Sequence, residues 1–146
     1  MKKALAAMIL ITITVFAATF AACINTTPLP IEDMAWEFLT VQDDSGNVLY
    51  CAESNAKVYP DAQVATAEVA FENDTVILTL NGEKIFQSTY IQADRDGKRT
   101  TLYSLPGDDD RYMTSSLAET NSDFKFGALI ITVETYTYYF FAPLID

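Results

Sequence analysis

The stretch ATAEVAFENDTVILTLNGEKIFQSTYIQ, residues 65–92, decides the predicted fold class because apolar and polar side chains alternate along it. Every second residue of 65–71 is apolar and the residues between them are mainly polar, which is typical of a strand with one buried and one wet face. Asn73-Asp74 and Asn81-Gly82 interrupt the alternation, and Asn-Gly between two such runs is a strong signal for a two-residue β-hairpin turn. The stretch therefore predicts three antiparallel strands, the last of which is expected to run unbroken over 83–92.

The same pattern continues on both sides of this stretch. Short runs rich in β-branched and aromatic residues alternate with turn residues, and no helical period is sustained. Nine strands are predicted, within residues 36–42, 48–52, 65–72, 75–80, 83–92, 99–105, 112–118, 124–134 and 136–142. Their hairpin-connected order favours closure of the sheet, because a closed sheet has no unpaired edges. We expect a single all-β domain over residues 35–146, a small up-and-down antiparallel barrel of eight to nine strands, with a two-sheet β-sandwich as the alternative.

Composition and charge exclude several classes of function. The chain carries 20 Asp and Glu against 9 Lys and Arg, a net charge of −11, so its surface repels phosphate backbones and no nucleic-acid partner is expected. It contains no His, which removes the commonest general base and the commonest metal ligand. No Ser-x-x-Lys or Gly-x-Ser-x-Gly motif occurs, and no spacing singles out a pair of catalytic carboxylates. We therefore predict that the protein is not an enzyme and uses no cofactor.

The N-terminus has the layout of a secretory signal. Lys2 and Lys3 precede an apolar, uncharged run over residues 4–22 that contains neither Gly nor Pro. We predict a lipoprotein signal peptide over residues 1–22, with a plain signal peptide or an uncleaved membrane anchor as the alternatives. All three place the remainder outside the cytoplasm, because the positive charge stays inside. The polar, proline-bearing residues that follow predict an extended tether over 23–34.

The end of the signal segment, Phe20-Ala21-Ala22-Cys23, resembles the lipobox of bacterial lipoproteins, with Phe20 where Leu is usual. In that family a diacylglyceryl group is attached to the cysteine, which becomes the mature N-terminus. The resemblance implies that Cys23 is the lipid-attachment residue and that its acyl chains anchor the protein to the bacterial cell membrane, either plasma or outer. The second cysteine, Cys51, stands in an apolar strand-like run, which predicts a buried small side chain and not a reactive thiol.

The layout as a whole resembles the lipocalin-like small lipoproteins of bacteria. Besides the lipobox and tether, the resemblance rests on Trp36 in the first strand, Asp43 and Gly46 in the first turn, Tyr50 in the second strand, and the aromatic last strand over 136–141. Met34 departs from the lipocalin pattern, which has Gly two residues before the tryptophan. The resemblance implies an eight-stranded barrel, lipid-anchored outside the cytoplasm, of a type that in some members carries an apolar ligand.

Three acidic clusters are candidates for a metal site: Asp43-Asp44, Asp94 with Asp96-Gly97, and Asp108-Asp109-Asp110. The second is similar to the start of a calcium-binding loop, but Leu105 occupies the twelfth position, where such a loop has Glu. Hairpin turns explain all three clusters better, so no metal is predicted.

Aromatic residues are the remaining candidates for a binding site. Five of them lie on strands whose alternation directs them toward one interior: Trp36, Tyr90, Tyr103, Tyr138 and Phe140. They either fill that interior or form the wall of a pocket for a small ligand. Both faces of 136–141 are aromatic, so one row is expected to lie outside, where a partner protein can cover it.

Two hypotheses of function follow. The first is a membrane-anchored extracytoplasmic lipoprotein that binds a small apolar or amphiphilic ligand, which requires a sealed cavity of at least roughly a few hundred Å³ with few charges and is excluded by a filled interior. The second is a non-enzymatic cell-surface protein-interaction module or inhibitor, which uses the acidic exterior and the outer aromatic row and whose association depends on salt.

Overall fold

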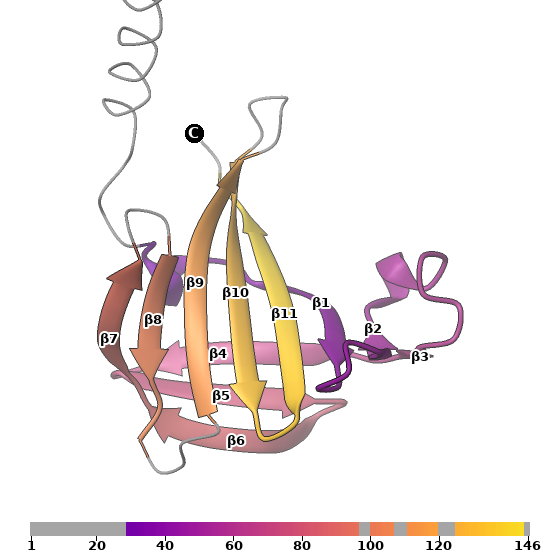
Figure 1. Cartoon of the computed structure of the whole chain (residues 1–146), viewed down its shortest axis with the longest axis horizontal. Coiled ribbons are helices and arrows are strands. Elements are labelled where there is room, and N and C mark those ends of the chain that lie inside the picture. Colours follow the sequence, from indigo (N-terminus) through magenta and orange to yellow (C-terminus); the bar gives the residue numbers. More distant parts are fainter. Residues whose placement is uncertain (1–28, 97–99, 107–110, 120–124, 145–146) are drawn as a thin grey trace, which may run out of the picture.

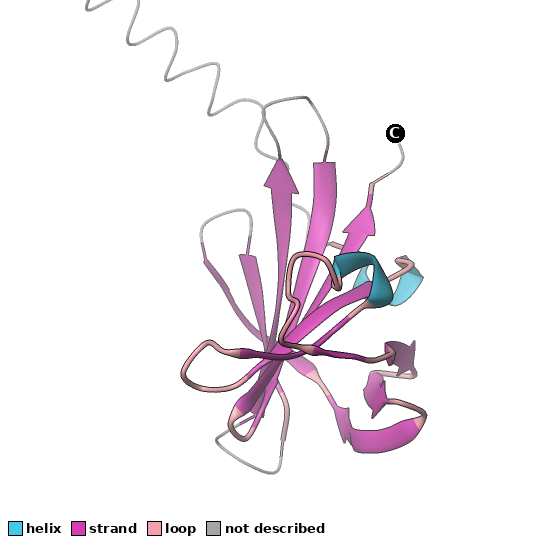
Figure 2. Cartoon of the chain, turned by 90° about the vertical axis from the view of Figure 1, so that its right-hand side faces the viewer, coloured by secondary structure: helices cyan, strands magenta, loops and turns pink. Residues whose placement is uncertain are grey.

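The computed structural model describes residues 29–96, 100–106, 111–119 and 125–144. These residues form strands and loops almost throughout, with short 3₁₀ helices η1 (Ile31–Asp33) and η2 (Glu53–Asn55) (Figure 2). The strands are β1 (Glu37–Gln42), β2 (Val48–Cys51), β3 (Gln63–Val64), β4 (Ala67–Glu72), β5 (Thr75–Leu80), β6 (Glu83–Thr89), β7 (Ile91–Asp96), β8 (Thr100–Ser104), β9 (Arg111–Glu119), β10 (Lys125–Val133) and β11 (Tyr136–Pro143). The predicted all-β class is confirmed.

The strands form two sheets. Eight of them make a large sheet in the order β3-β2-β1-β11-β10-β9-β8-β7, and β4, β5 and β6 make a small sheet whose strands run crosswise to the long strands of the large one (Figure 1). Neighbouring strands are antiparallel except for the short parallel pair β2 and β3. Within the described residues no ladder joins β3 to β4 or β6 to β7, so the predicted closed barrel is wrong and the two sheets agree with the alternative expectation.

The strand predicted over 83–92 is interrupted at Tyr90, and this interruption separates the sheets. The chain leaves the small sheet after Thr89 and enters the large sheet at Ile91. No Gly, Pro or Asn stands between Lys84 and Gln92 to mark the break, which is why the sequence predicted one strand. Because the chain changes sheets at this point, β6 and β7 pair with different neighbours and the ring of strands does not close.

Tyr90 is held at this corner by contacts on several sides. Its backbone N–H donates to the carbonyl oxygen of Asp74 at 2.9 Å, and its hydroxyl donates to the carboxylate of Glu32. The ring packs edge-on against Phe71 and Tyr103, with centroid distances of 5.6 and 5.7 Å. These contacts join the small sheet, the large sheet and the N-terminal segment at one residue.

The Tyr90 corner is expected to weaken at alkaline pH. Burial, the hydrogen bond to Glu32 and the charge of its carboxylate raise the pKa of the Tyr90 hydroxyl above its ordinary value. The contribution of this residue to stability is therefore complete below about pH 10, where tyrosine in an unfolded chain ionises, and is lost as the pH rises through the folded-state pKa. The free energy of unfolding should fall by at most about 1.4 kcal/mol per pH unit from this group, less because solvent screens it.

Urea unfolding at pH 9 and at pH 10.5 checks this expectation. Tyr90→Phe should flatten the loss of stability between the two pH values, and Glu32→Gln should flatten it partly, because the amide accepts the hydrogen bond without the negative charge. An unchanged slope in Tyr90→Phe would show that other groups account for the alkaline loss.

The two predicted hairpin turns of the small sheet are present, whereas Asp94 and Asp96, expected in a turn, lie in β7. Asn81 and Gly82, between β5 and β6, have φ of 51° and 80°, and Asn73 and Asp74, between β4 and β5, have φ of 49° and 58°. Positive φ at both central residues defines the type I′ turn, whose twist matches that of the flanking strands. The turn residues read from the sequence therefore fix the register of the small sheet.

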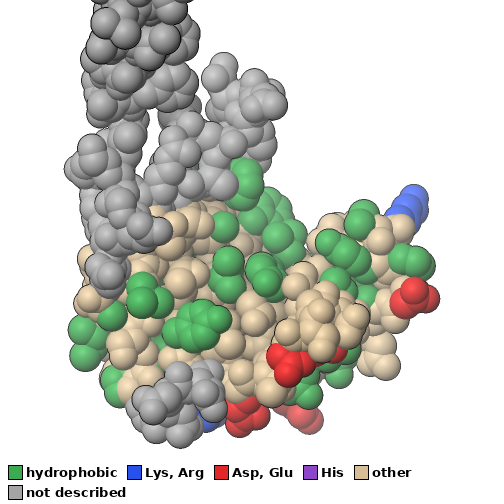
Figure 3. Space-filling view, viewed as in Figure 1, with side chains coloured by type: hydrophobic (Ala, Val, Ile, Leu, Met, Phe, Trp, Pro, Cys, Tyr) green, Lys and Arg blue, Asp and Glu red, His purple; other side chains and the backbone are tan. Residues whose placement is uncertain are grey.

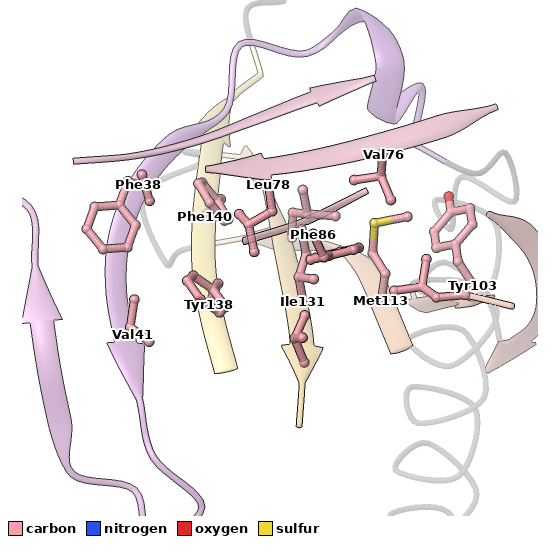
Figure 4. Close-up of a cluster of buried hydrophobic side chains, with 14 of the residues drawn as sticks. Phe38, Val41, Val76, Leu78, Phe86, Tyr103, Met113, Ile131, Tyr138 and Phe140 are labelled. Carbon is pink, nitrogen blue, oxygen red and sulfur yellow. The ribbon is translucent and has the colours of Figure 1, made fainter. Parts of the chain in front are cut away.

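The core lies between the two sheets (Figure 4). The small sheet contributes Val76 and Leu78, which are fully buried, and the large sheet faces them with residues of comparable burial, among them Met113, Leu129, Ile131 and Phe140. Cys51 is also fully buried, as predicted, and is a free thiol. Burial of these side chains from water is the main force that holds the sheets together.

The N-terminal segment packs on one end of this core. Ile31 is 4% exposed, and Trp36 Nε1 donates to its carbonyl oxygen at 2.8 Å. Gly127 of β10 leaves the space that this segment fills, since a Cβ at that position would lie 2.5 Å from Met34 Cε and 3.3 Å from Leu29 Cδ1. Residues 29–34, assigned to the tether on sequence grounds, are therefore part of the folded domain, whereas Cys23 and the predicted signal peptide lie outside the described residues.

Candidate functional site

A pocket of about 350 Å³ opens at the opposite end of β10, where this strand turns into β11. Both sheets contribute to it, and we call it the end pocket. Its lining residues are Val41, Leu49, Tyr50, Leu80, Ile85, Arg111, Val133, Glu134, Tyr136 and Tyr138.

The floor of the end pocket is apolar. Val41 of β1 and Val133 of β10 are 1% and 6% exposed, and Leu80 closes the side formed by the small sheet. Tyr138 lies beside Val41, its register partner, and is 3% exposed (Figure 4). Water in contact with such a floor is readily displaced by an apolar group.

Two walls of the end pocket come from β-bulges. Val41 pairs with Tyr50 whereas Gln42 pairs with Val48, so Leu49 is the extra residue of β2. In the small sheet, the register of β6 shifts between the partners of Leu78 and Thr79, and Ile85 is the extra residue there. A bulge re-aims a side chain relative to regular alternation, and here both extra residues line the pocket.

The rim of the end pocket carries polar and charged groups. Arg111 begins β9 and pairs with Val133, which in turn pairs with Tyr136 of β11. The Arg111 guanidinium carbon lies 6.0 Å from the centroid of the Phe86 ring, so this side chain reaches from the large sheet to the small one. Glu134 has φ 57° in the turn between β10 and β11 and is exposed.

The Tyr138 hydroxyl of the pocket remains neutral at ordinary pH. Burial raises the pKa of the Tyr138 hydroxyl, and the nearby Tyr136, Tyr50 and Glu134 raise it further. A neutral phenol both donates and accepts hydrogen bonds. The pocket therefore offers hydrogen-bonding hydroxyls, an arginine and one carboxylate above an apolar floor.

Of the five aromatic residues predicted from the sequence, Tyr138 lines the end pocket and the others lie elsewhere. Phe140 and Tyr103 are 1% and 5% exposed within the core. Tyr90 occupies the corner between the sheets, and Trp36 packs on Gly127 at the far end of the core. The structure thus does not bring these five residues together into one wall.

The remaining pocket residues were missed by reading the sequence. Tyr136 could have been found, because it precedes Tyr138 by two positions and so shares its face of the strand. Leu49 and Ile85 could not have been found, because a bulge has no fixed sequence signal. It also places the extra side chain on the face of the strand opposite to the one that alternation predicts. Arg111 has no distinguishing motif in the sequence, because it directly follows the acidic run Asp108-Asp109-Asp110.

The acidic cluster at Asp43 is explained by its turn. Its carboxylate accepts hydrogen bonds from the backbone N–H groups of Ser45 and Asn47, at 3.0 and 2.8 Å, and from Asn47 Nδ2 at 2.9 Å. The bonds from Asn47, followed by those from Ser45 and Gly46, lower the pKa of Asp43. The other two clusters lie in parts of the chain whose side chains the structure does not describe, and no group of three metal-ligating residues occurs among those it does.

The outer face of the large sheet carries two neighbouring cross-strand rows that are uncharged on β8, β9, β10 and β11, the second of which continues on β7 with Asp94, the partner of Leu102. One row consists of Ile91, Ser104, Tyr112, Thr132 and Thr137, and the other of Leu102, Thr114, Ile130, Tyr139 and Thr40. Figure 3 shows this face, with the acidic and basic side chains toward its lower and right-hand edges. Tyr139 and Phe141 lie on it half-buried, so the aromatic row expected to face away from the core does so. Thr40 and Thr132 are themselves buried, so a partner on these rows would meet their remaining side chains, which on β8 to β11 are neutral and not the acidic exterior that the second hypothesis invokes.

No family model, curated protein or solved structure matches the chain. Among the described residues, the structure contains no helix with the length and apolar character needed to cross a membrane.

Proposed function

We propose that the chain is a lipid-anchored, extracytoplasmic binding protein whose two-sheet β-sandwich holds a small amphiphilic ligand in the end pocket. The composition of the pocket wall carries the proposal, because an aliphatic floor and a polar rim line an open pocket of about 350 Å³. Pockets for small molecules typically have volumes of roughly 300–1,000 Å³ and a mainly apolar lining with a few polar groups. An amphiphile matches such a wall since its tail covers the floor while its head group reaches the rim.

The anchored location rests on the sequence. The resemblance of Phe20-Ala21-Ala22-Cys23 to a lipobox supports attachment of lipid to Cys23, and the membrane is then the first partner of the protein. The basic residues at the N-terminus support export of everything that follows the signal peptide.

Binding without catalysis is supported by the chemistry of the wall. The ionisable residues that line the pocket are Arg111, Glu134 and three tyrosines. Glu134 is the single carboxylate among the lining residues, so the wall lacks the paired carboxylates of a glycosidase, and the chain has no His to serve as a base.

Replacing Ile85 by Trp is expected to abolish ligand retention. Ile85 lines the end pocket but is 38% exposed, so a larger ring can occupy the pocket without displacing a buried side chain. Native mass spectrometry of the full chain, extracted from its own cell envelope and released from detergent micelles, should show an added mass that organic extraction removes. The variant should carry no such mass.

Ile91→Trp is the matched control for this experiment. Ile91 is 63% exposed on the outer face of β7, away from the end pocket, so the same substitution there should leave the added mass in place. Retention of the mass by Ile85→Trp would place the ligand elsewhere on the protein. A wild-type chain that carries no mass, and binds none of the amphiphiles used below, would contradict the proposed function.

A further inference from the structure

Opposite charges stand on two sides of the end pocket. Arg111 and Tyr136 both pair with Val133, so they lie two strand spacings apart, about 10 Å between their backbones, with Val133 between them. Glu134 follows Val133 in the turn, on the rim of the same pocket. A head group above Val133 therefore meets a guanidinium on one side and tyrosines with a carboxylate on the other.

The Arg111 side suits an anionic group. Its guanidinium is half-buried and lies against the Phe86 ring, with the Cζ to centroid distance of 6.0 Å given above, which restricts the side chain to few conformations. A guanidinium presents five N–H donors in a planar fork, so it can bind a phosphate while keeping its other contacts.

The opposite side suits a cationic group. Tyr50 and Tyr138 pair with the same residue, Val41, from its two neighbouring strands, and Tyr136 is two positions before Tyr138. Aromatic faces attract ammonium groups, most strongly where the site excludes water, and the Glu134 carboxylate adds a charge of the right sign. Tyr136, Tyr50 and Glu134 each raise the pKa of Tyr138, which agrees with their proximity to it.

We propose that the end pocket selects an amphiphile with a zwitterionic head group, in which a phosphate faces Arg111 and an ammonium lies among the tyrosines beside Glu134. This inference rests on the proposed function. A purely anionic head group would be repelled by the net charge of −11 and by Glu134 on the rim. A purely cationic head group would place a like charge beside Arg111. A zwitterion matches both charges of the rim and is neutral overall.

Isothermal titration of the full chain in lipid nanodiscs tests the preference. The probes share one hexyl tail and differ in the head group: hexylphosphocholine, hexyltrimethylammonium, hexyl sulfate and hexyl glucoside. Empty nanodiscs and the Ile85→Trp protein serve as blanks. We expect hexylphosphocholine to bind about tenfold more tightly than any other probe. Phosphocholine without a tail distinguishes a free zwitterion from a lipid-like ligand, and it should bind weakly because it leaves the floor uncovered.

Variants of the two charged residues assign the head-group contacts. Glu134→Gln should lower the affinity for hexylphosphocholine severalfold and reduce the ratio of this affinity to that for hexyl sulfate. Arg111→Gln should reduce the ratio of the affinity for hexylphosphocholine to that for hexyltrimethylammonium. Glu72→Gln, at an exposed position on β4, changes the net charge equally and should leave the order of affinities intact. Arg111→Lys, which keeps the charge but not the fork, provides a second variant if Arg111→Gln fails to fold.

The outcomes separate the two proposals. If no probe binds above the blanks, the proposed function fails. If hexyl sulfate or hexyltrimethylammonium binds as tightly as hexylphosphocholine, the pocket binds amphiphiles but the zwitterionic preference is overturned. The preference is also overturned if Glu134→Gln and Glu72→Gln change the affinities alike.

Discussion

Phe140→Ala is expected to lower the free energy of unfolding by about 3–5 kcal/mol, the usual cost of deleting a fully buried aromatic side chain. Phe140 is 1% exposed, and its ring lies 5.8 Å from that of Phe38, tilted by 56°. Truncation removes this contact and leaves a cavity between the two sheets, facing Leu78 of the small sheet (Figure 4). Urea unfolding followed by the fluorescence of Trp36, the single tryptophan of the chain, measures the loss.

Phe141→Ala is the matched control, because it deletes the same side chain from the next residue of β11. Phe141 is half-buried on the outer face and contributes nothing to the core cluster. Its truncation should cost about 1–2 kcal/mol, since less apolar surface is returned to water. Equal losses in the two variants would mean that the outer face is as well buried as the core, and hence that something covers it in solution.

Gly127→Val is expected to lower the free energy of unfolding by about 1–3 kcal/mol, the usual cost of overpacking. The new Cβ would lie 2.5 Å from Met34 Cε and 3.1 Å from Trp36 Cη2, closer than side chains pack, so the N-terminal segment must move away from β10. Displacement of Trp36 toward water should also shift its fluorescence emission to longer wavelength. Both readouts come from the same unfolding experiment.

Met34→Ala provides the test of this explanation. It removes the atom nearest to the new Cβ, so the double variant Gly127→Val/Met34→Ala should be more stable than the sum of the two single changes predicts. Strict additivity would show that valine disturbs β10 itself and not the packing of the N-terminal segment against it.

Local pattern predicted most of the individual strands and the hairpin turns of the small sheet, but it missed β3 and the assembly of the strands. Alternation and positive-φ turn residues such as Asn81 and Gly82 act over a few residues, so they can be read from the sequence. The change of sheet at Tyr90 depends on Phe71, Tyr103 and Glu32, which are distant in the chain and meet only in the fold. The break at Tyr90 and the missing ladder between β3 and β4 together leave two sheets in place of the expected barrel.

The candidate site was harder to predict for a related reason. Tyr138 was found because it follows the alternation of its strand, whereas Leu49 and Ile85 reach the pocket through bulges that break alternation. Arg111 and Tyr136 become neighbours only through their shared partner Val133. The alternation of apolar and polar residues therefore identifies core residues, whereas the end pocket is shaped by the β-bulges at Leu49 and Ile85.

The two ends of β10 differ in a way that bears on access. The N-terminal segment lies on Gly127 near one end, and the end pocket opens beside Val133 at the other, about 20 Å away along a strand that rises about 3.3 Å per residue. If Cys23 carries the lipid, the chain joins the domain on the side remote from the pocket. The pocket mouth and the entry point of the anchored chain would then lie at opposite ends of the domain, so the anchor itself would not block the mouth.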